Sequence, residues 1–318
     1  MMNKRVLITG GLGYVGGRIA QYLAADSSLS LRLTSRRADT PKPDWLNDGE
    51  IVQWDIAQDD SVICAGVDAV IHLAALNEID CAQDALAALQ VNGMGTLRLL
   101  QAAQSAGVRR FIYFSTAHVY GAPLAGSISE QTVPRPIHPY AITHKVAEDF
   151  VLAARDLGKI DSIVLRLSNG FGAPIATDVN RWTLLVNDLC RQAVSTGKLV
   201  LRSSGLQQRD FITLQDAARC VAHFMALPKA DCRDGLFNLG GECSRSIFAM
   251  TQLVAFRCQA VLGFTPPIER VEPQLGEQAA ALDYSIAKLK TTGFALQSRF
   301  EDEIDATLSL CQQAFRKN

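Results

Sequence analysis

The 318-residue sequence lacks a long apolar run, because glycines interrupt its first apolar stretch after a few residues. No segment approaches the roughly 20 apolar residues that a membrane-spanning helix needs, so we expect neither a membrane anchor nor a secretory leader. An excess of one charge is also missing, with 31 Lys and Arg against 32 Asp and Glu. Such a balanced chain has little electrostatic attraction for nucleic acid or an anionic membrane surface.

Cysteine pairs separated by two residues are absent as well, and none of the eight cysteines is clustered with histidine at metal-ligand spacing. We therefore expect reduced, mostly buried thiols, no metal site and a cytoplasmic location. The composition, 48% apolar and 20% charged, is that of an ordinary globular chain. At this length such a chain can bury a sizeable core.

The most informative segment is the glycine-rich stretch near the amino terminus. A β-branched apolar run ends at Thr9, and Gly10, Gly13 and Gly16 follow before an apolar helical pattern begins. A strand that passes through a glycine turn into a helix lets backbone N–H groups approach a pyrophosphate at the helix N-terminus. The segment therefore predicts a dinucleotide site.

Short apolar runs alternate with helical patterns, which predicts parallel βαβ units. The expected strands are 5–9, 29–35, 51–54, 68–73, 110–115 and 161–167, and the expected helices are 15–25, 83–106 and 139–157. Later elements are shorter: helices near 181–195, 215–226 and 246–257, and a strand near 199–202.

We predict an α/β fold, a doubly wound parallel Rossmann sheet with a small C-terminal substrate-binding lobe. Residues 1–170 would form the dinucleotide-binding domain. Residues 171–318 would form mainly the lobe, with a segment at about 205–240 returning to the first domain.

The end of the second expected strand bears on the cofactor. An acid there would bind the adenosine ribose of NAD, but the sequence has Ser35, Arg36 and Arg37. Two guanidinium groups suit a 2′-phosphate, so NADP is preferred over NAD. The alternative is that both arginines only solvate a loop.

Nine short motifs follow one another along the chain: TGGLGYVG (9–16), WDI (54–56), HLAA (72–75), VNGMGT (91–96), FSTAHVYG (114–121), PYAITHKVAE (139–148), LRLSNGFGAP (165–174), RDFI (209–212) and FNLGG (237–241). Together they resemble the extended short-chain dehydrogenase/reductases, specifically the NAD-dependent epimerase/dehydratase family. The succession reaches about residue 241 and is more specific than any one motif.

The resemblance implies roles for individual residues. Thr116 would hydrogen-bond the reacting oxygen, and Tyr140 would exchange the proton. Asn169 and Arg209 would hold the diphosphate of a nucleotide sugar, and Ser115 and His118 would also face the substrate. The cofactor would contact Gly10, Gly13, Tyr14, Val15, Asp55, Ile56, Leu73, Ala74, Ala75, Asn92, His144 and Leu167. Helices 83–106 and 139–157 would form a homodimer contact.

One departure affects the catalytic pair. A tyrosine needs a neighbouring cation to act as a base near neutrality, and the family supplies it as a lysine four residues after the tyrosine. Here that position is His144, and Lys145 comes one residue later. Three alternatives stay open: His144 replaces the lysine, about a quarter of it being protonated at pH 7; a helix bulge brings Lys145 inward; or the site has little turnover.

Two further departures narrow the reaction. Dehydratases of the family carry an Asp-Glu pair after the threonine, where this chain has Ala117 and His118, so dehydration is disfavoured. The segment 272–283 also lacks an arginine that nucleotide-sugar members usually have. We expect an NAD(P)-dependent oxidoreductase or epimerase acting on a sugar, preferably nucleotide-linked. The alternatives are a non-catalytic dinucleotide-binding sensor or scaffold, and a reductase of a small non-nucleotide carbonyl compound.

Overall fold

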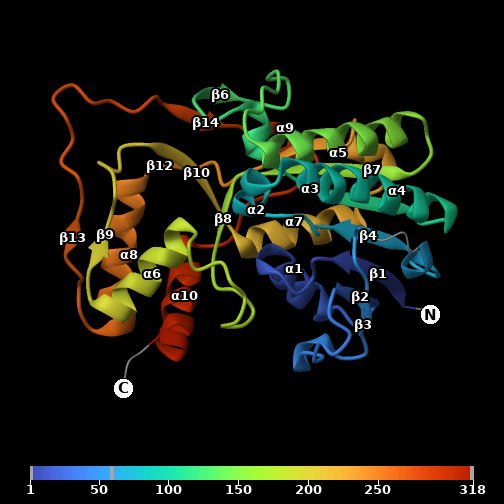
Figure 1. The fold of residues 1–318 in the computed structure, drawn as a ribbon, viewed down its shortest axis with the longest axis horizontal. Helices are drawn as coiled ribbons and strands as arrows, with labels where there is room; N and C mark the ends of the chain where they lie inside the picture. Colours follow the sequence, from blue (N-terminus) through green and yellow to red (C-terminus); the bar gives the residue numbers. More distant parts are fainter. Residues whose placement is uncertain (1–2, 58–60, 316–318) are drawn as a thin grey trace.

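The computed structural model describes residues 3–57 and 61–315. At its centre lies a seven-stranded parallel sheet of strand order β11-β7-β5-β4-β1-β2-β3 (Figure 1). Its strands are β1 (Lys4–Thr9), β2 (Leu29–Ser35), β3 (Glu50–Gln53), β4 (Ala69–His72), β5 (Arg110–Thr116), β7 (Asp161–Leu167) and β11 (Leu236–Leu239). The predicted doubly wound α/β fold is confirmed. The strand order reverses between β1 and β4, the place where such sheets bind ligands.

The two faces of the sheet are covered by different helices because strand residues alternate between faces. Val6 and Ile8 pack with α1 (Tyr14–Ala24) and α7 (Leu214–Ala226). Leu7 packs on the other side with α4 (Thr96–Ser105) and α5 (Pro139–Asp156). The nearly continuous apolar character of the strands follows from this burial on both faces.

The expected continuous helix over 83–106 is wrong. The structure has α2 (Glu78–Gln83), α3 (Ala85–Ala88), a π-helical turn η3 (Leu89–Gly95) and then α4. The chain breaks at Asp84, which is extended and whose carboxylate accepts from the N–H groups of Leu86 and Ala87, so it caps a new helix. The alanine-rich periodicity of the segment conceals this cap.

The smaller part of the molecule contains three helices around one apolar core, α6 (Leu185–Thr196), α8 (Ile247–Leu262) and α10 (Phe300–Phe315), on the left in Figure 1. Of these, α10 has no counterpart among the predicted elements. Around them lie β8 (Asn169–Phe171), β10 (Gln208–Thr213) and β12 (Ser244–Ser246) in one sheet, with β9 (Leu199–Val200) and β13 (Ile268–Glu269) paired in another. The remaining elements are β6 (Gly126–Ile128), β14 (Leu282–Tyr284), α9 (Ala287–Lys290), η1 (Asp44–Leu46), η2 (Ser61–Cys64), η4 (Ala117–Tyr120) and η5 (Lys229–Cys232).

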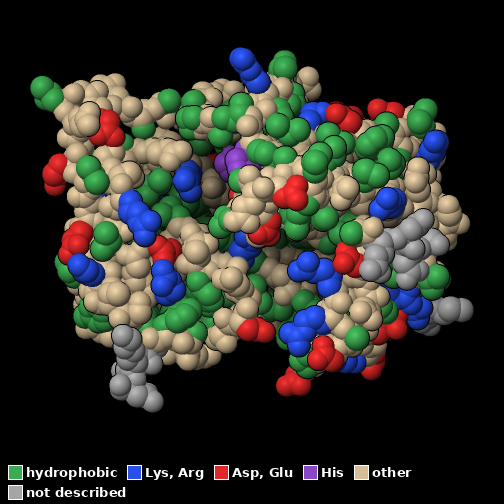
Figure 2. All heavy atoms as spheres, in the orientation of Figure 1, with side chains coloured by type: hydrophobic (Ala, Val, Ile, Leu, Met, Phe, Trp, Pro, Cys, Tyr) green, Lys and Arg blue, Asp and Glu red, His purple; other side chains and the backbone are tan. Residues whose placement is uncertain are grey.

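Within the described residues no helix is long and apolar enough to cross a membrane. A hollow lies between the three-helix part and the large sheet, with basic side chains beside it (Figure 2).

Candidate active site

A cavity of about 640 Å³ opens at the carboxyl ends of β1, β4, β5 and β7. The smaller part closes its other side with β8, β10 and α6. The predicted site residues that line this cavity are Gly10, Gly13, Tyr14, Val15, Leu73, Ala74, Ala75, Ser115, Thr116, His118, Tyr140, His144, Leu167, Asn169 and Arg209. Segments far apart in the sequence are thus brought to one place.

The glycine turn has the geometry of a phosphate cradle. Gly10 has a positive φ of +69°, which disfavours any residue with a side chain. A Cβ on Gly16 would lie 2.2 Å from the carbonyl oxygen of Gly10, so only glycine permits this close approach. The turn leads directly into the eleven-residue helix α1, whose first N–H groups have no intrahelical acceptor. These features fit a dinucleotide pyrophosphate.

The side chain of Tyr14 points away from this cradle. Its hydroxyl lies 3.0 Å from the Gly172 carbonyl oxygen and 3.2 Å from Asn187 Oδ1, both in the smaller part. Burial raises the pKa of the Tyr14 phenol. Only the backbone of Tyr14 is therefore left to contact a phosphate.

Tyr140 and His144 lie one turn apart on α5, with ring centroids 4.4 Å apart in an edge-on arrangement. Helix α5 begins here because Pro139 occupies its first turn and the His138 ring accepts from the Tyr140 N–H. His144 Nδ1 lies 2.7 Å from the Tyr113 hydroxyl, whereas Nε2 is buried with no partner among the described residues.

The electrostatics of this pair differ from the expected ones. Burial lowers the pKa of His144 to about 4, so its ring is neutral at pH 7 rather than one-quarter protonated. Burial, and next the negative charge of Glu78, raise the pKa of Tyr140. With no cation supplied at position 144, the raised pKa of Tyr140 favours its protonated phenol at neutral pH.

Lys145 does not point into the cavity. Helix α5 is regular through this position, so the bulge that would turn Lys145 inward is absent from it. The ammonium instead forms an ion pair with Asp149 one turn later. The alternative in which Lys145 fills the lysine role is therefore not the arrangement of this structure.

Ser115 and Thr116 end β5 at the cavity wall. The Ser115 hydroxyl is buried without a hydrogen-bond partner among the described residues, which marks it as a group that a ligand would satisfy. Thr116 Oγ1 accepts from the His118 N–H at 3.2 Å and caps η4. Its own hydroxyl hydrogen remains available to a substrate oxygen, and His118 lies exposed in the same wall.

Arg209 is a half-buried cation without an acidic partner in the described part of the chain. Arg209 forms no ion pair with Asp210, its neighbour in the chain. The Asp210 carboxylate instead accepts from Ser168 Oγ and from the N–H groups of Gly241 and Cys243. Beside Arg209, Asn169 donates to the Asp210 carbonyl oxygen at 2.9 Å, which fixes its amide at the cavity.

Asn92 acts from the π-helical turn without lining the cavity. Its Oδ1 accepts from the Leu76 N–H at 2.8 Å, and its Nδ2 donates to Thr143 Oγ1 at 3.1 Å. It therefore ties the β4–α2 loop to α5. The π-helix places this amide inward, a frequent use of such turns at functional sites.

Besides Asn92, four predicted cofactor residues lie outside the cavity. Arg36 and Arg37 are exposed beyond the end of β2, and Arg37 lies 3.4 Å from Asp39. The Asp55 carboxylate accepts from the Ala57 N–H, and Ile56 is buried against η3. Strand β3 joins the two segments, because its Gln53 side chain donates to the Arg36 carbonyl oxygen.

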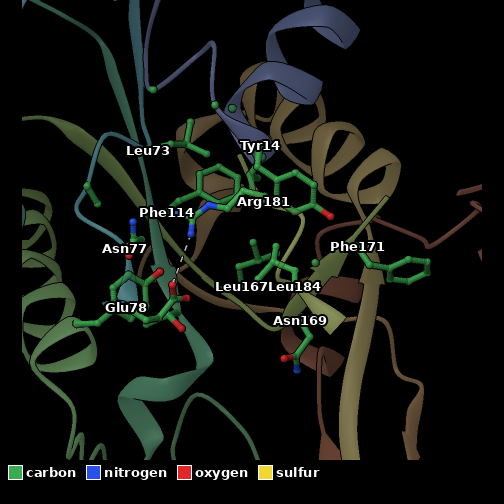
Figure 3. A pocket seen from close by; sticks show the side chains of 18 of the residues that line it. Tyr14, Leu73, Asn77, Glu78, Phe114, Leu167, Asn169, Phe171, Arg181 and Leu184 are labelled. Atoms are coloured by element: carbon green, nitrogen blue, oxygen red, sulfur yellow. Dashed lines mark ion pairs between the residues drawn. The ribbon is translucent and has the colours of Figure 1, made fainter. Parts of the chain in front are cut away.

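Two charged residues of the cavity were not predicted. Glu78 and Arg181 point toward one another from opposite walls, with their charged atoms 3.8 Å apart (Figure 3). Glu78 follows the end of β4, and the rule that parallel sheets bind ligands at their carboxyl edge is the signal that indicates it. Arg181 lies in an irregular segment where no periodic pattern indicates a position. In the described residues no cluster of three metal-ligating side chains occurs.

The family model described as "NAD dependent epimerase/dehydratase family" matches residues 6–240. The chain belongs to this family. Its members are enzymes of the extended short-chain dehydrogenase/reductase type, and so is this chain.

Two curated relatives of the family match almost end to end. A low-salt glycan biosynthesis protein of Haloferax volcanii is 27% identical over 95% of this chain and 96% of its own. A GDP-6-deoxy-D-mannose reductase of Pseudomonas aeruginosa is 28% identical over 97% of each chain.

Solved structures share the fold. A UDP-N-acetylglucosamine 4-epimerase of Methanobrevibacter ruminantium is 22% identical, with a TM-score of 0.81 over 98% of both chains. A UDP-glucuronic acid 4-epimerase of Bacillus cereus, solved with UDP-glucuronic acid and NAD, has a TM-score of 0.78 at 22% identity. The match covers 97% of this chain and 99% of the epimerase.

Proposed function

We propose that this family member is an NAD(P)-dependent oxidoreductase or epimerase that acts on a nucleotide sugar. The observation that carries the proposal is the cavity that combines the glycine cradle, Tyr140 with Thr116, and Arg209 without an acidic partner among the described residues. Each group suits a different part of one complex: the dinucleotide, the reacting carbon and an anionic diphosphate.

Tyr140 and Thr116 carry the proton chemistry. A bound nicotinamide supplies the hydride acceptor or donor. The Thr116 hydroxyl orients the reacting oxygen by hydrogen bonding. Tyr140, protonated at rest, donates to a carbonyl oxygen when it is reduced, and its phenolate accepts the proton when a hydroxyl is oxidised.

His144 takes the position that the family gives to lysine, as a neutral donor rather than a cation. Its unpartnered Nε2 supports a hydrogen bond to the nicotinamide ribose. A neutral ring stabilises the Tyr140 phenolate less than an ammonium does. We therefore expect proton donation to a carbonyl to be easier for this site than proton abstraction from a hydroxyl.

Arg209 and Asn169 are assigned to the substrate diphosphate. Burial without an acid leaves the Arg209 guanidinium able to pair with a phosphate oxygen. This assignment supports a nucleotide-linked sugar over a small non-nucleotide carbonyl compound. An Arg209→Gln variant is expected to raise the KM for a nucleotide sugar about tenfold or more and to leave dinucleotide binding unchanged.

For the dinucleotide we propose NADP over NAD. Arg36 and Arg37 are exposed next to the expected adenosine ribose and suit a 2′-phosphate. The double variant Arg36→Ala/Arg37→Ala should lose most of the preference for NADP over NAD. Equal NADP affinity before and after the change would assign both arginines to the solvated loop.

Dehydration is disfavoured in the proposal because Ala117 and His118 replace the carboxylates that the family's dehydratases use there. Glu78 is the acid among the described lining residues, and it lies across from Arg181 at the start of α2 rather than directly after Thr116. A product lacking one water when the chain is given a nucleotide sugar would overturn this part of the proposal.

The decisive experiment offers UDP-, GDP- and dTDP-linked hexoses with each dinucleotide. Nicotinamide absorbance reports net reduction or oxidation, and chromatography with NMR of the sugar reports epimerisation, which gives no net absorbance change. Tyr140→Phe should bind dinucleotide and lose turnover by about 10²–10⁴-fold. Dinucleotide binding without any product from the parent chain would favour the sensor or scaffold, and turnover of simple ketones alone would favour the small-carbonyl reductase.

A homodimer and a cytoplasmic location complete the proposal. Exposed apolar side chains gather over α3, η3 and α5: Leu86, Leu89, Met94, Ile142 and Phe150 (Figure 2). Such a patch suits a self-associating surface. A Phe150→Glu variant should elute as one chain if the parent elutes as two.

All eight cysteines are free thiols, which suits a reducing compartment such as the cytoplasm.

A further inference from the structure

We infer that Tyr113 is a positioning residue that fixes the tautomer of His144, holding the ring hydrogen on Nε2 at the cavity wall. The inference rests on the proposed function for its catalytic meaning, because His144 occupies the position expected to contact the nicotinamide ribose. Its structural basis is the hydrogen bond between the Tyr113 hydroxyl and His144 Nδ1, which are 2.7 Å apart in a buried environment.

The direction of this hydrogen bond follows from the chemistry of the two groups. A phenol is a better hydrogen donor than a neutral imidazole N–H, and an imidazole nitrogen is a good acceptor. Tyr113 therefore donates to Nδ1, and the hydrogen of the neutral ring resides on Nε2. Because Tyr113 does not line the cavity and His144 does, Nδ1 faces the protein interior.

The groups behind Tyr113 are already engaged. The Thr96 hydroxyl, which also lies beside the phenol, donates to the Asn92 carbonyl oxygen at 2.6 Å and is 2.9 Å from His72 Nε2. Because the Thr96 hydrogen goes to Asn92, His72 Nε2 donates to Thr96 Oγ1, and His72 Nδ1 accepts from the Thr9 hydroxyl at 2.6 Å. These bonds leave His144 Nδ1 as the well-placed acceptor for the Tyr113 hydrogen.

The consequence is a pre-formed donor. His144 Nε2 is buried and has no partner among the described residues, so its N–H has no acceptor until a ligand supplies one. A lysine ammonium donates in any direction, whereas an imidazole donates only from the nitrogen that carries hydrogen. Tyr113 thus makes histidine usable at a position where the family has lysine.

The test is the tautomer of His144 in the cofactor-free full chain, read by NMR of protein labelled with ¹⁵N-histidine. The chain has five histidines, and a His144→Gln variant identifies the signal of His144. The inference expects the Nε2–H tautomer in the parent protein. The Nδ1–H tautomer there would overturn it, and this measurement needs no turnover.

Variants provide the second arm. Tyr113→Phe should abolish the single tautomer and weaken dinucleotide binding about five- to tenfold. Tyr284→Phe is the matched control, since it removes another buried hydroxyl, which donates to the Arg166 carbonyl oxygen, and it should change neither readout. An unchanged tautomer in Tyr113→Phe would refute the positioning role.

Two conservative replacements of His144 distinguish which of its ring nitrogens donates to the dinucleotide. Glutamine carries an N–H at the ε position and should retain more dinucleotide affinity than asparagine, whose amide is placed like Nδ1. The reverse order would contradict an Nε2–H donor. Failure of the proposed function is distinguishable, because absence of turnover with the predicted tautomer leaves the role of Tyr113 standing.

Discussion

Acidification is expected to destabilise the protein through two buried histidines. Burial lowers the pKa of His144 to about 4 and that of His72 to about 3, from the ordinary value of 6.5. Between these values and pH 6.5 the unfolded chain binds more protons than the folded one. Stability from both rings is therefore fully present above about pH 6.5 and is lost as the pH falls toward 4.

The magnitude follows from the depressed pKa values. At pH 5.0, which is 1.5 units below the histidine pKa of the unfolded chain, keeping one ring neutral lowers the free energy of unfolding by ~2 kcal/mol relative to pH 7.5. The two histidines together account for ~4 kcal/mol. This is a large share of the 5–15 kcal/mol that stabilises a typical protein of this kind.

The assay is denaturant unfolding at pH 7.5 and 5.0 for the parent, His144→Gln and Tyr284→Phe. Carboxylates titrate alike in all three proteins, so their contribution cancels when the losses of unfolding free energy between pH 7.5 and 5.0 are compared. His144→Gln should lose ~2 kcal/mol less than the parent between the two pH values. Tyr284→Phe should be less stable than the parent at both pH values and show the parent's pH dependence. Equal pH dependence of the parent and His144→Gln would refute a buried neutral ring at position 144.

Further predictions concern α5. Lys145→Ala should leave turnover within about twofold, because its ammonium pairs with Asp149 at the surface, and a kinetic assay showing abolished turnover would restore the bulge alternative. His144→Lys should keep or raise turnover, since a cation there stabilises the Tyr140 phenolate. A loss of activity in the same assay would contradict the proposal that His144 takes the position of the family's lysine. Glu148→Gln should destabilise the fold by about 3–5 kcal/mol in denaturant unfolding, because it leaves the buried Arg166 without its charge partner at 2.7 Å; a change below about 1 kcal/mol would speak against this pair.

Much of the fold was predictable because its signals are local. The glycine turn, the buried strands and the start of α5 each depend on residues within a few positions, and the structure has them where the sequence indicates. The helix over 83–106 was mispredicted because its break depends on one capping carboxylate, Asp84, within an otherwise uniform alanine-rich pattern.

The sequence predicted which distant segments meet at the cavity better than it predicted the electrostatics there. Order along the chain placed Thr116, Tyr140 and Arg209 in one cavity. The neutral state of His144 depends on burial by distant segments, and the approach of Arg181 to Glu78 depends on how an irregular loop folds back. Sequence spacing contains neither of these facts.

The position of strand β11 limits how this chain can be truncated or recombined with relatives. It pairs with β7 at the edge of the large sheet, although the chain reaches it only after building α6 and α7. A fragment that stops near residue 170 would expose one flank of β7 and uncover the apolar side of α1 that α7 shields. Exchange of specificity between relatives must therefore graft discontinuous segments, and heating the intact chain should give one cooperative melting transition rather than two.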